Sequence, residues 1–224
     1  MTLDQLHTRF KILYDKIDSF NYPELTPEAI DEFLCIGQEK LIDFVLKEGV
    51  ESNGEYADWL KNITLPYTTN TFYTRPLNKP DSKFVVLPDD YRSALLEEVT
   101  ITYTKCGTLT TERIKVVPIT RDRYNIIKDD PFNKPNEEVV HRIVSANISG
   151  AQTFELISSA GVTIVQYHLD YIQQPPRIEY GSQYATPTFD APCVLVDKAQ
   201  ERLVRIAVEE AHQALGLTQQ QQNN

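Results

Sequence analysis

The sequence predicts an α+β protein, in which helices at both ends of the chain pack with a mostly antiparallel β-sheet. Apolar residues recur at three- and four-residue steps near both ends, as they do along amphipathic helices. Between the ends, Thr, Tyr, Val and Ile are dense and prolines interrupt the chain, which is typical of strands. With 224 residues, the chain is long enough to bury a core without disulfides or metals.

A helical segment is expected at residues 1–65. The apolar stripe of its first helix consists of Leu3, Leu6, Phe10, Leu13 and Ile17. A second helix is expected to begin at Pro27, because proline at the first helical position loses no hydrogen bond and Thr26 can cap the free amide groups. This helix is expected to stop near Gly49, and a short third helix is expected around Tyr56–Leu60.

A β-rich domain with short helical insertions is expected at residues 66–190. Its candidate strands, in chain order, are Phe72–Arg75, Phe84–Leu87, Leu96–Tyr103, Arg113–Pro118, Val139–Ala146, Thr153–Ile157 and Val162–Gln173. Two hairpins are predicted, one turning at Gly107 between the third and fourth strands, and one at Ser159–Gly161 between the last two. Asp89–Tyr91 and Thr120–Lys128 are expected to be the helical insertions.

A C-terminal helix is expected at residues 191–217 and is expected to return to the helical segment. Asp190-Ala191-Pro192 can open this helix, and Gly216 can end it because glycine tolerates the left-handed conformation of a helix cap. Residues 218–224 form a Gln/Asn tail with nothing to bury, so we expect the tail to be disordered in the isolated protein.

The charge balance argues against a protein that binds nucleic acid. The chain has 22 basic and 32 acidic residues, and residues 1–65 alone carry 6 basic against 13 acidic. Nucleic-acid binding depends on Lys and Arg residues that neutralise phosphates, and a sequence with this excess of acidic residues does not indicate such a basic surface. No apolar run approaches the roughly 20 residues that cross a bilayer, and the N-terminus, which mixes charged with apolar residues, is unlike a signal peptide. We expect the protein to fold in a cytoplasm.

The sequence contains no arrangement of residues typical of an active site. It has no glycine-rich phosphate loop and no HExxH motif. Cys35, Cys106 and Cys193 lack the spacing of a zinc site or of a disulfide framework. We therefore expect no enzymatic activity, no cofactor and no metal.

Several short motifs nevertheless follow one another in a distinctive order. They are Phe84-Val85-Val86-Leu87-Pro88-Asp89-Asp90-Tyr91, then Asp130-Pro131-Phe132-Asn133-Lys134-Pro135, then Tyr171-Ile172-Gln173-Gln174-Pro175-Pro176-Arg177-Ile178, and finally Phe189-Asp190-Ala191-Pro192 before a helix with Ala207-Val208-Glu209-Glu210-Ala211. In this order they resemble the head-to-tail connector, or ring, proteins of crAss-like short-tailed bacteriophages, which are similar to tail-tubular adaptor proteins. The resemblance covers the chain from Leu3 to Gly216.

The resemblance implies a structural virion protein without an active site or cofactor. Such proteins form a ring-shaped homo-oligomer, expected to be twelve-fold, beneath the portal protein. The ring would extend the portal DNA channel and dock other ring and tail proteins, while DNA passes through without specific binding and no membrane is involved. The protein would assemble in the host cytoplasm and reside in the head–tail connector of the virion.

A ring needs two different exposed faces that meet between neighbouring subunits. The aromatic and proline-containing loops Thr68–Pro80 and Pro175–Phe189 are candidates for these faces. The candidate oligomer or partner contacts are Phe72, Tyr73, Phe132, Tyr180, Tyr184 and Phe189.

Two alternatives stay open from the residues alone. Trp59 and twelve tyrosines would suit a tail-associated, carbohydrate- or receptor-binding β module, although most are expected to pack within the protein. A hydrolase could use an acidic pair such as Asp129–Asp130, or Cys193 with His212. However, Cys193 and His212 would lie about five turns apart on one helix, too far to touch.

Overall fold

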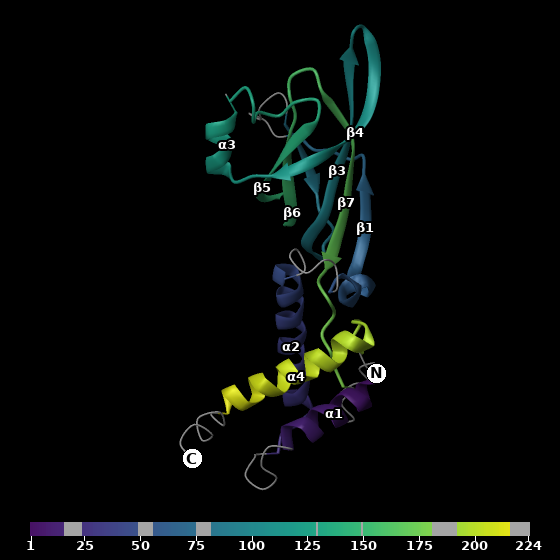
Figure 1. Cartoon of the computed structure of the whole chain (residues 1–224), viewed down its shortest axis with the longest axis vertical. Helices are drawn as coiled ribbons and strands as arrows, with labels where there is room; N and C mark the ends of the chain where they lie inside the picture. Colours follow the sequence, from purple (N-terminus) through teal and green to yellow (C-terminus); the bar gives the residue numbers. More distant parts are fainter. Residues whose placement is uncertain are drawn as a thin grey trace. The chain divides into compact units, whose positions relative to one another are not determined.

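The computed structural model describes residues 1–15, 24–48, 56–74, 82–128, 130–148, 150–180 and 192–215. The chain divides into two compact units (Figure 1). The helical unit comprises Met1–Ile63 and Pro175–Asn224, and the sheet unit comprises Thr64–Gln174. Helices plus a mixed sheet confirm the predicted α+β class.

The helical unit contains helices α1 (Leu3–Asp15), α2 (Pro27–Glu48) and α4 (Asp197–Ala214), together with the 3₁₀ helix η1 (Ala57–Ile63). The predicted start of α2 is confirmed, because Pro27 is its first residue and the amide of Ala29 donates to the hydroxyl of Thr26 at 3.3 Å. None of the described helices is both long enough and apolar enough to cross a membrane.

Helix α4 begins five residues later than the opening expected at Pro192. The segment before it is held outside the helix because the side-chain amide Nε2 of Gln200 donates to the carbonyl groups of Cys193 and Leu195, at 3.3 and 2.6 Å. Cys193 therefore lies outside the helix. Asp190, Ala191, Gly216 and the 218–224 tail lie outside the described residues.

The sheet unit is one seven-stranded sheet in the order β1-β7-β3-β4-β5-β6-β2. Its strands are β1 (Thr64–Thr69), β2 (Ser82–Val86), β3 (Tyr91–Lys105), β4 (Thr108–Pro118), β5 (Val139–Ile148), β6 (Ala151–Ile157) and β7 (Thr163–Gln173). Among these strands, only β4 and β5 pair in parallel, and α3 (Arg121–Ile127) lies in the connection between them. The predicted helical insertion at Thr120–Lys128 is thereby confirmed.

Two apolar clusters stabilise the sheet unit. The larger one covers one face of the sheet with buried side chains from six strands, among them Val99, Ile101 and Tyr167. On β5 the side chains alternate, so that Val140 joins this cluster whereas Ile143 points to the opposite face, where it packs with Tyr124 of α3. Helix α3 is therefore fixed against the sheet by its buried tyrosine.

The hairpin predicted at Gly107 is confirmed, but the one predicted at Ser159–Gly161 is wrong. Strand β6 pairs with β5 and β2, whereas β7 pairs with β1 and β3. A turn does form there, with the amide of Val162 donating to the carbonyl of Ser159, but it directs the chain to another part of the sheet. The hairpin partner of β6 is β5, through a turn at Gly150.

Two further predictions of local structure are corrected. Asp89–Tyr91 forms a turn into β3 rather than a helix, since Asp90 is held by its partners in β7: its carboxylate accepts from the hydroxyl of Tyr171 at 2.9 Å, and its carbonyl accepts from the amide of Gln174. In the Phe72–Arg75 segment, only an isolated bridge from Tyr73 to Phe84 forms in place of a strand. Arg75 lies outside the described residues.

Candidate protein interface

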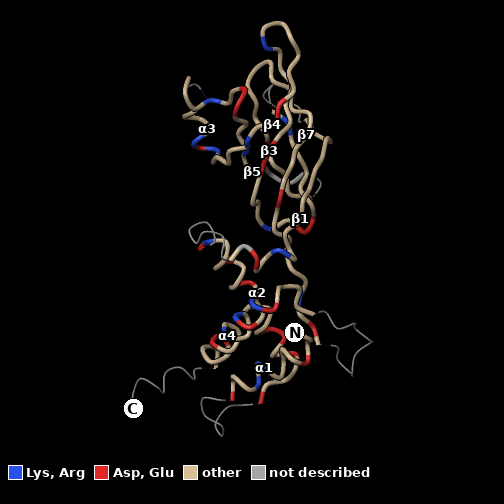
Figure 2. The backbone as a smooth tube through the Cα atoms, turned by 45° about the vertical axis from the view of Figure 1, so that its right-hand side comes forward, with Lys and Arg blue, Asp and Glu red and all other residues tan. Residues whose placement is uncertain are grey.

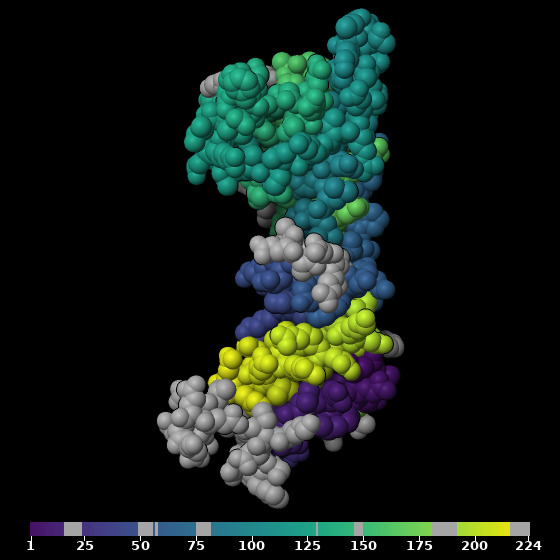
Figure 3. Space-filling model, in the orientation of Figure 1, coloured from purple at the N-terminus to yellow at the C-terminus, as the bar shows by residue number. Residues whose placement is uncertain are grey.

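The three most exposed large apolar side chains among the described residues lie at two places on the sheet unit: Phe132 is 90% exposed, Ile126 77% and Leu109 72%. Ile126 belongs to α3 and Phe132 to the turn after it, whereas Leu109 belongs to the β3–β4 hairpin. The segment around α3 and this hairpin form different parts of the surface of the sheet unit (Figure 3). Clustered exposed apolar side chains are typical of a surface that binds another protein.

The turn that presents Phe132 is built by one carboxylate. Asp130 accepts hydrogen bonds from the amide of Phe132 at 2.9 Å and from the side chain of Asn133 at 2.6 Å. The carbonyl of Asp130 also accepts from the amide of Lys134 at 3.0 Å. These bonds favour the charged carboxylate and lower the pKa of Asp130. Phe132 is thus held outward by an ordered turn.

Helix α3 supports this turn from the other side. The amide of Arg123 donates to the hydroxyl of Thr120, which caps the helix. Tyr124 is buried against Ile143 and Ile157, which leaves Ile126 on the outer face. We call α3 and residues 130–135 together the α3-turn surface.

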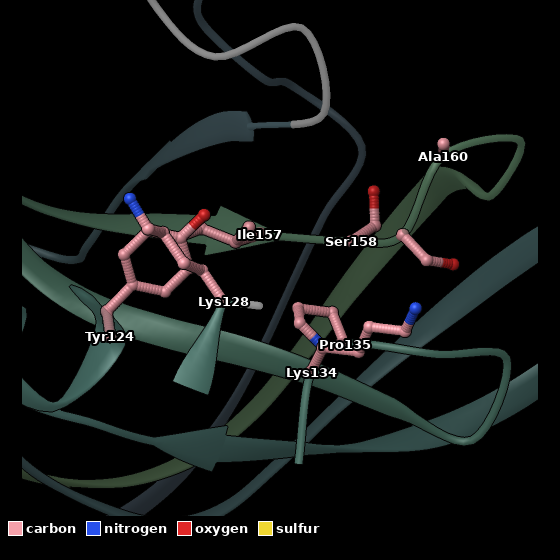
Figure 4. Close-up of a pocket in the computed structure, with 8 residues that line it drawn as sticks. Tyr124, Lys128, Lys134, Pro135, Ile157, Ser158 and Ala160 are labelled. Atoms are coloured by element: carbon pink, nitrogen blue, oxygen red, sulfur yellow. The ribbon is translucent and has the colours of Figure 1, made fainter. Parts of the chain in front are cut away.

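A cavity of about 420 Å³ opens within the α3-turn surface. Figure 4 shows Tyr124 and Lys128 on one side of it, Ser158 and Ala160 on the other, and Lys134 and Pro135 between them. The ammonium groups of Lys128 and Lys134 and the hydroxyl groups of Ser158 and Ser159 line this cavity, and none of its described lining residues carries a carboxylate. Such a lining is suited to a carboxylate group of another protein.

A second cavity, of about 280 Å³, lies in the helical unit beside α1. Aromatic and aliphatic side chains, among them Phe10, Tyr14 and Leu25, form part of its lining. Asp15 and Glu24 supply two carboxylates and are both exposed. This cavity is therefore opposite in charge to the one in the α3-turn surface.

The same contrast holds at the level of the two units. The helical unit contains 10 basic and 19 acidic residues, whereas the sheet unit contains 12 and 13. The acidic residues of α1, α2 and α4 are visible as the red segments of those helices in Figure 2. Nearly all the net negative charge thus belongs to the helical unit.

The structure places the six predicted contact residues in different settings. Phe72 is half-buried, packed against the sheet core with the ammonium group of Lys83 5.1 Å from its ring centre. Tyr73 is 45% exposed beside β2, and Phe132 is the aromatic anchor of the α3-turn surface. Tyr184 and Phe189 lie outside the described residues.

Tyr180, although 38% exposed, is tied to the helical unit. Its amide donates to Asp31 and its hydroxyl donates to Asp4, each at 2.8 Å. Its ring lies 4.8 Å from the ring of His7. Only the outer part of Tyr180 is therefore available to a partner.

Sequence reasoning missed Ile126, Lys128 and Lys134 as parts of the candidate interface. A signal for Ile126 was present, because α3 already buries Tyr124 and an isoleucine two residues later must point elsewhere on a helix. No such signal existed for the lysines, since the cavity forms only when the loop after β6 meets the 130–135 turn.

The residues proposed for a hydrolase do not converge. The thiol of Cys193 contacts the side-chain oxygen of Gln38 at 3.4 Å, and burial raises the pKa of this thiol to about 11. His212 packs near Tyr14, with ring centres 5.3 Å apart. Asp130 is committed to its turn, and Asp129 lies outside the described residues. Within the described ranges, no group of three or more metal-binding side chains forms.

The sheet core contains a carboxylate, Glu97, whose pKa is raised. Burial raises the pKa of Glu97, while Arg142, whose guanidinium lies 3.0 Å from the Glu97 carboxylate, opposes that shift. Arg142 also stacks 4.0 Å from the ring centre of Phe154. These contacts join β3 to β5 inside the sheet unit, so a structural role accounts for the pair.

Comparison with known proteins identifies the family of this chain. The family model described as "Phage tail ring protein 3/4" matches residues 1–220. The chain is also similar to "Ring protein 3" of Bacteroides phage crAss001, with 28% identity over 167 residues that cover 70% of each chain.

Proposed function

Because the chain belongs to the family of phage tail ring proteins 3/4, we propose that it is a subunit of a head-to-tail connector ring. Membership of the family makes it a structural protein of the phage virion rather than a member of a known enzyme class. In the proposed role, copies of the chain form a ring beneath the portal protein. The ring extends the DNA channel and docks later tail components.

The observation that carries this proposal is the exposure of Phe132 on a hydrogen-bonded turn. Burying a phenylalanine side chain contributes about 1.5–3 kcal/mol, so a side chain that is 90% exposed leaves most of that free energy unused in the single chain. Aromatic residues in such positions are typical anchors of protein interfaces. An assembly that covers Phe132 recovers this free energy.

The charge of the helical unit is suited to a DNA channel. With 19 acidic against 10 basic residues, this unit carries a net negative charge that repels phosphates. DNA would therefore pass a ring lined by these helices without specific binding.

The test is assembly of the full-length protein, measured by mass photometry and electron microscopy, alone and mixed with the portal and tail proteins of its phage. We expect a closed ring, twelve-fold to match the portal, in at least the mixed sample. A chain that stays monomeric beside every one of these proteins, and that is absent from virions, would overturn the proposal.

The carbohydrate- or receptor-binding alternative has less support. Of the ten tyrosines within the described residues, only Tyr73 and Tyr180 are exposed, and Tyr180 uses its hydroxyl on Asp4. The others are buried or half-buried, where they pack in the two cores. Glycan binding that is lost on Tyr73→Ala would favour this alternative.

A further inference from the structure

We propose that the α3-turn surface of one subunit docks at the cavity beside α1 of the next subunit. In this contact, Phe132 enters the cavity and Lys134 lies beside the carboxylates of Asp15 and Glu24. The inference rests on the proposed ring function and names the two surfaces that meet at the seam between subunits.

The sizes of the two partners match. The cavity beside α1 has a volume of about 280 Å³, which exceeds the ~150 Å³ that accommodates a benzene ring in an apolar cavity. Of its apolar lining, Leu25 is half-buried, whereas Phe10 and Tyr14 are buried behind the opening. Phe132 is held outward by Asp130, so a partner can bury its ring without reorganising the turn.

The charges of the two partners also match. Lys128 and Lys134 carry ammonium groups with no anionic partner among the described residues. Among the described residues that line the other cavity, the two carboxylates of Asp15 and Glu24 outnumber the ammonium group of Lys11. The α3-turn surface therefore supplies positive charge and the cavity beside α1 supplies negative charge. Two copies of the same surface would repel each other.

Because the contact joins two different surfaces, it determines which kind of assembly the subunits form. Every copy carries both surfaces, one on each unit, so each contact leaves a free surface at both ends of the growing assembly. Contacts between two different surfaces generate rings when the rotation closes, whereas contacts between identical surfaces generate two-fold dimers. The proposed seam thus agrees with a ring.

A charge-swap experiment tests the seam. The variants are Lys134→Glu, Glu24→Lys and the double variant, with Lys105→Glu at the tip of the β3–β4 hairpin as a control for the same charge change. Ring formation is measured by mass photometry, alone and with the portal and tail proteins, after circular dichroism has shown that each variant is folded. We expect each single swap to weaken subunit association by about fivefold or more, and the double variant and Lys105→Glu to assemble like the wild type.

A second comparison tests the apolar part of the contact. Phe132→Ser should weaken association at least about tenfold, because an aromatic anchor is lost. Leu109→Ser removes a similarly exposed side chain from the hairpin and should have no effect.

The outcomes separate this inference from the proposed function. Rings of wild-type stability in Lys134→Glu, Glu24→Lys and Phe132→Ser would overturn the seam and leave the ring function standing. A double swap that fails to restore association would overturn the pairing of Lys134 with Glu24. A wild type that forms no ring with any virion protein would overturn the ring function and the seam together.

Discussion

At the scale of single residues, the Glu97–Arg142 pair is a buried ionic contact within the sheet unit. The two side chains are buried, 5% and 13% exposed, and their strands β3 and β5 are not neighbours in the sheet. Arg142 is held twice, by the carboxylate of Glu97 and by the ring of Phe154. The pair therefore connects two parts of the sheet that backbone hydrogen bonds do not join directly.

Arg142→Ala is expected to lower the free energy of unfolding by about 3–5 kcal/mol near neutral pH, because it leaves the carboxylate of Glu97 buried without a counter-charge. Chemical denaturation followed by circular dichroism measures this change. The loss should shrink as the pH is lowered, because Glu97 then takes up a proton.

The direction of this pH dependence follows from the pKa of Glu97, which is raised in the folded state above its ordinary 4.5. A raised pKa contributes stability that is complete below pH 4.5 and is lost as the pH rises through the folded-state value. Glu97→Gln combined with Arg142→Ala removes the titrating group, so this double variant should show the smaller pH dependence. If the free energy of unfolding depends equally on pH in Arg142→Ala and in the double variant, Glu97 is not the group that titrates.

His141 gives the sheet unit the opposite pH response. Burial, with a contribution from Arg123, lowers the pKa of His141 below its ordinary 6.5. The neutral imidazole is thus favoured in the folded state, and its contribution to stability is present above pH 6.5 and is lost as the pH falls through the folded-state pKa.

His141→Phe should therefore lose less stability between pH 7 and pH 5 than the wild type, as measured by thermal unfolding. His168, whose pKa is lowered as well, is present in both proteins and cancels in the difference. If both proteins lose stability equally over this range, His141 is not the group responsible.

Residue-level predictions from sequence succeeded where one side chain determines its own surroundings. Thr26 was predicted as a cap, because a hydroxyl before a helix acts on amides two or three residues away. The roles of Glu97 and Arg142 could not be predicted, since they are 45 residues apart and meet only through the fold. The cavity lined by Lys128, Lys134 and Ser158 could not be predicted for the same reason, since these residues meet only through the fold.

At the scale of elements, the contact between α2 and α4 depends on the absence of one side chain. A Cβ atom added at Gly37 would lie 2.9 Å from the carbonyl oxygen of Leu203 and 3.1 Å from the Cβ of Ala207. The two helices can approach this closely only because Gly37 and Ala207 face each other.

Gly37→Val is therefore expected to lower the free energy of unfolding by about 1–3 kcal/mol, because the added methyl groups force the helices apart. Denaturant unfolding measures the change. Valine has a higher helix propensity than glycine, so helix propensity alone predicts no loss at position 37. An unchanged stability of Gly37→Val would show that the close approach has no energetic weight.

The β3–β4 hairpin carries a residue in an unfavourable conformation. Both turn residues have positive φ angles, 50° at Cys106 and 82° at Gly107. Turns of this kind favour Asn-Gly, because a side chain other than Gly, Asn or Asp is strained there.

Cys106→Asn is expected to stabilise the protein by about 0.5–1 kcal/mol, and Cys106→Val to destabilise it, because β-branched residues tolerate positive φ poorly. Urea unfolding under reducing conditions measures both changes. An equal stability of the two variants would show that the turn does not restrain φ at this position.

Element predictions from sequence were accurate where the signal is local. The apolar period of α1 and α2, and the turn at Gly107, depend on residues within a few positions of one another. Strand order is set by pairing between distant segments, so the same turn residues that mark a hairpin at Gly107 mark a change of direction at Gly161. Six of the seven candidate strands therefore coincide with strands of the described sheet, whereas Phe72–Arg75 does not and the strand order could not be predicted.

At the scale of the whole molecule, the two units differ in net charge. The helical unit carries most of the excess of acidic over basic residues, and the sheet unit is close to neutral. A seam between Lys134 and the carboxylates of Asp15 and Glu24 depends on unscreened charge at a partly exposed surface.

Ring formation is therefore expected to weaken as NaCl is raised from 0.1 to 1 M, because the screening length falls from about 10 to about 3 Å. Mass photometry over this range measures the effect. Lys134→Glu should show the reverse trend, since salt screens its repulsion from Asp15 and Glu24. Salt-independent assembly of both proteins would contradict an electrostatic contribution.

The pairing of β1 with β7 has a consequence for biosynthesis. Thr64 lies opposite Ile172, so the ribosome must translate more than a hundred further residues before β1 has a partner. At about 5–20 residues per second, this takes on the order of 5–20 s. During that interval Leu65 and Tyr67, which later pack against the core, have no partner strand to cover them. The nascent chain is therefore most exposed to aggregation before β7 leaves the exit tunnel.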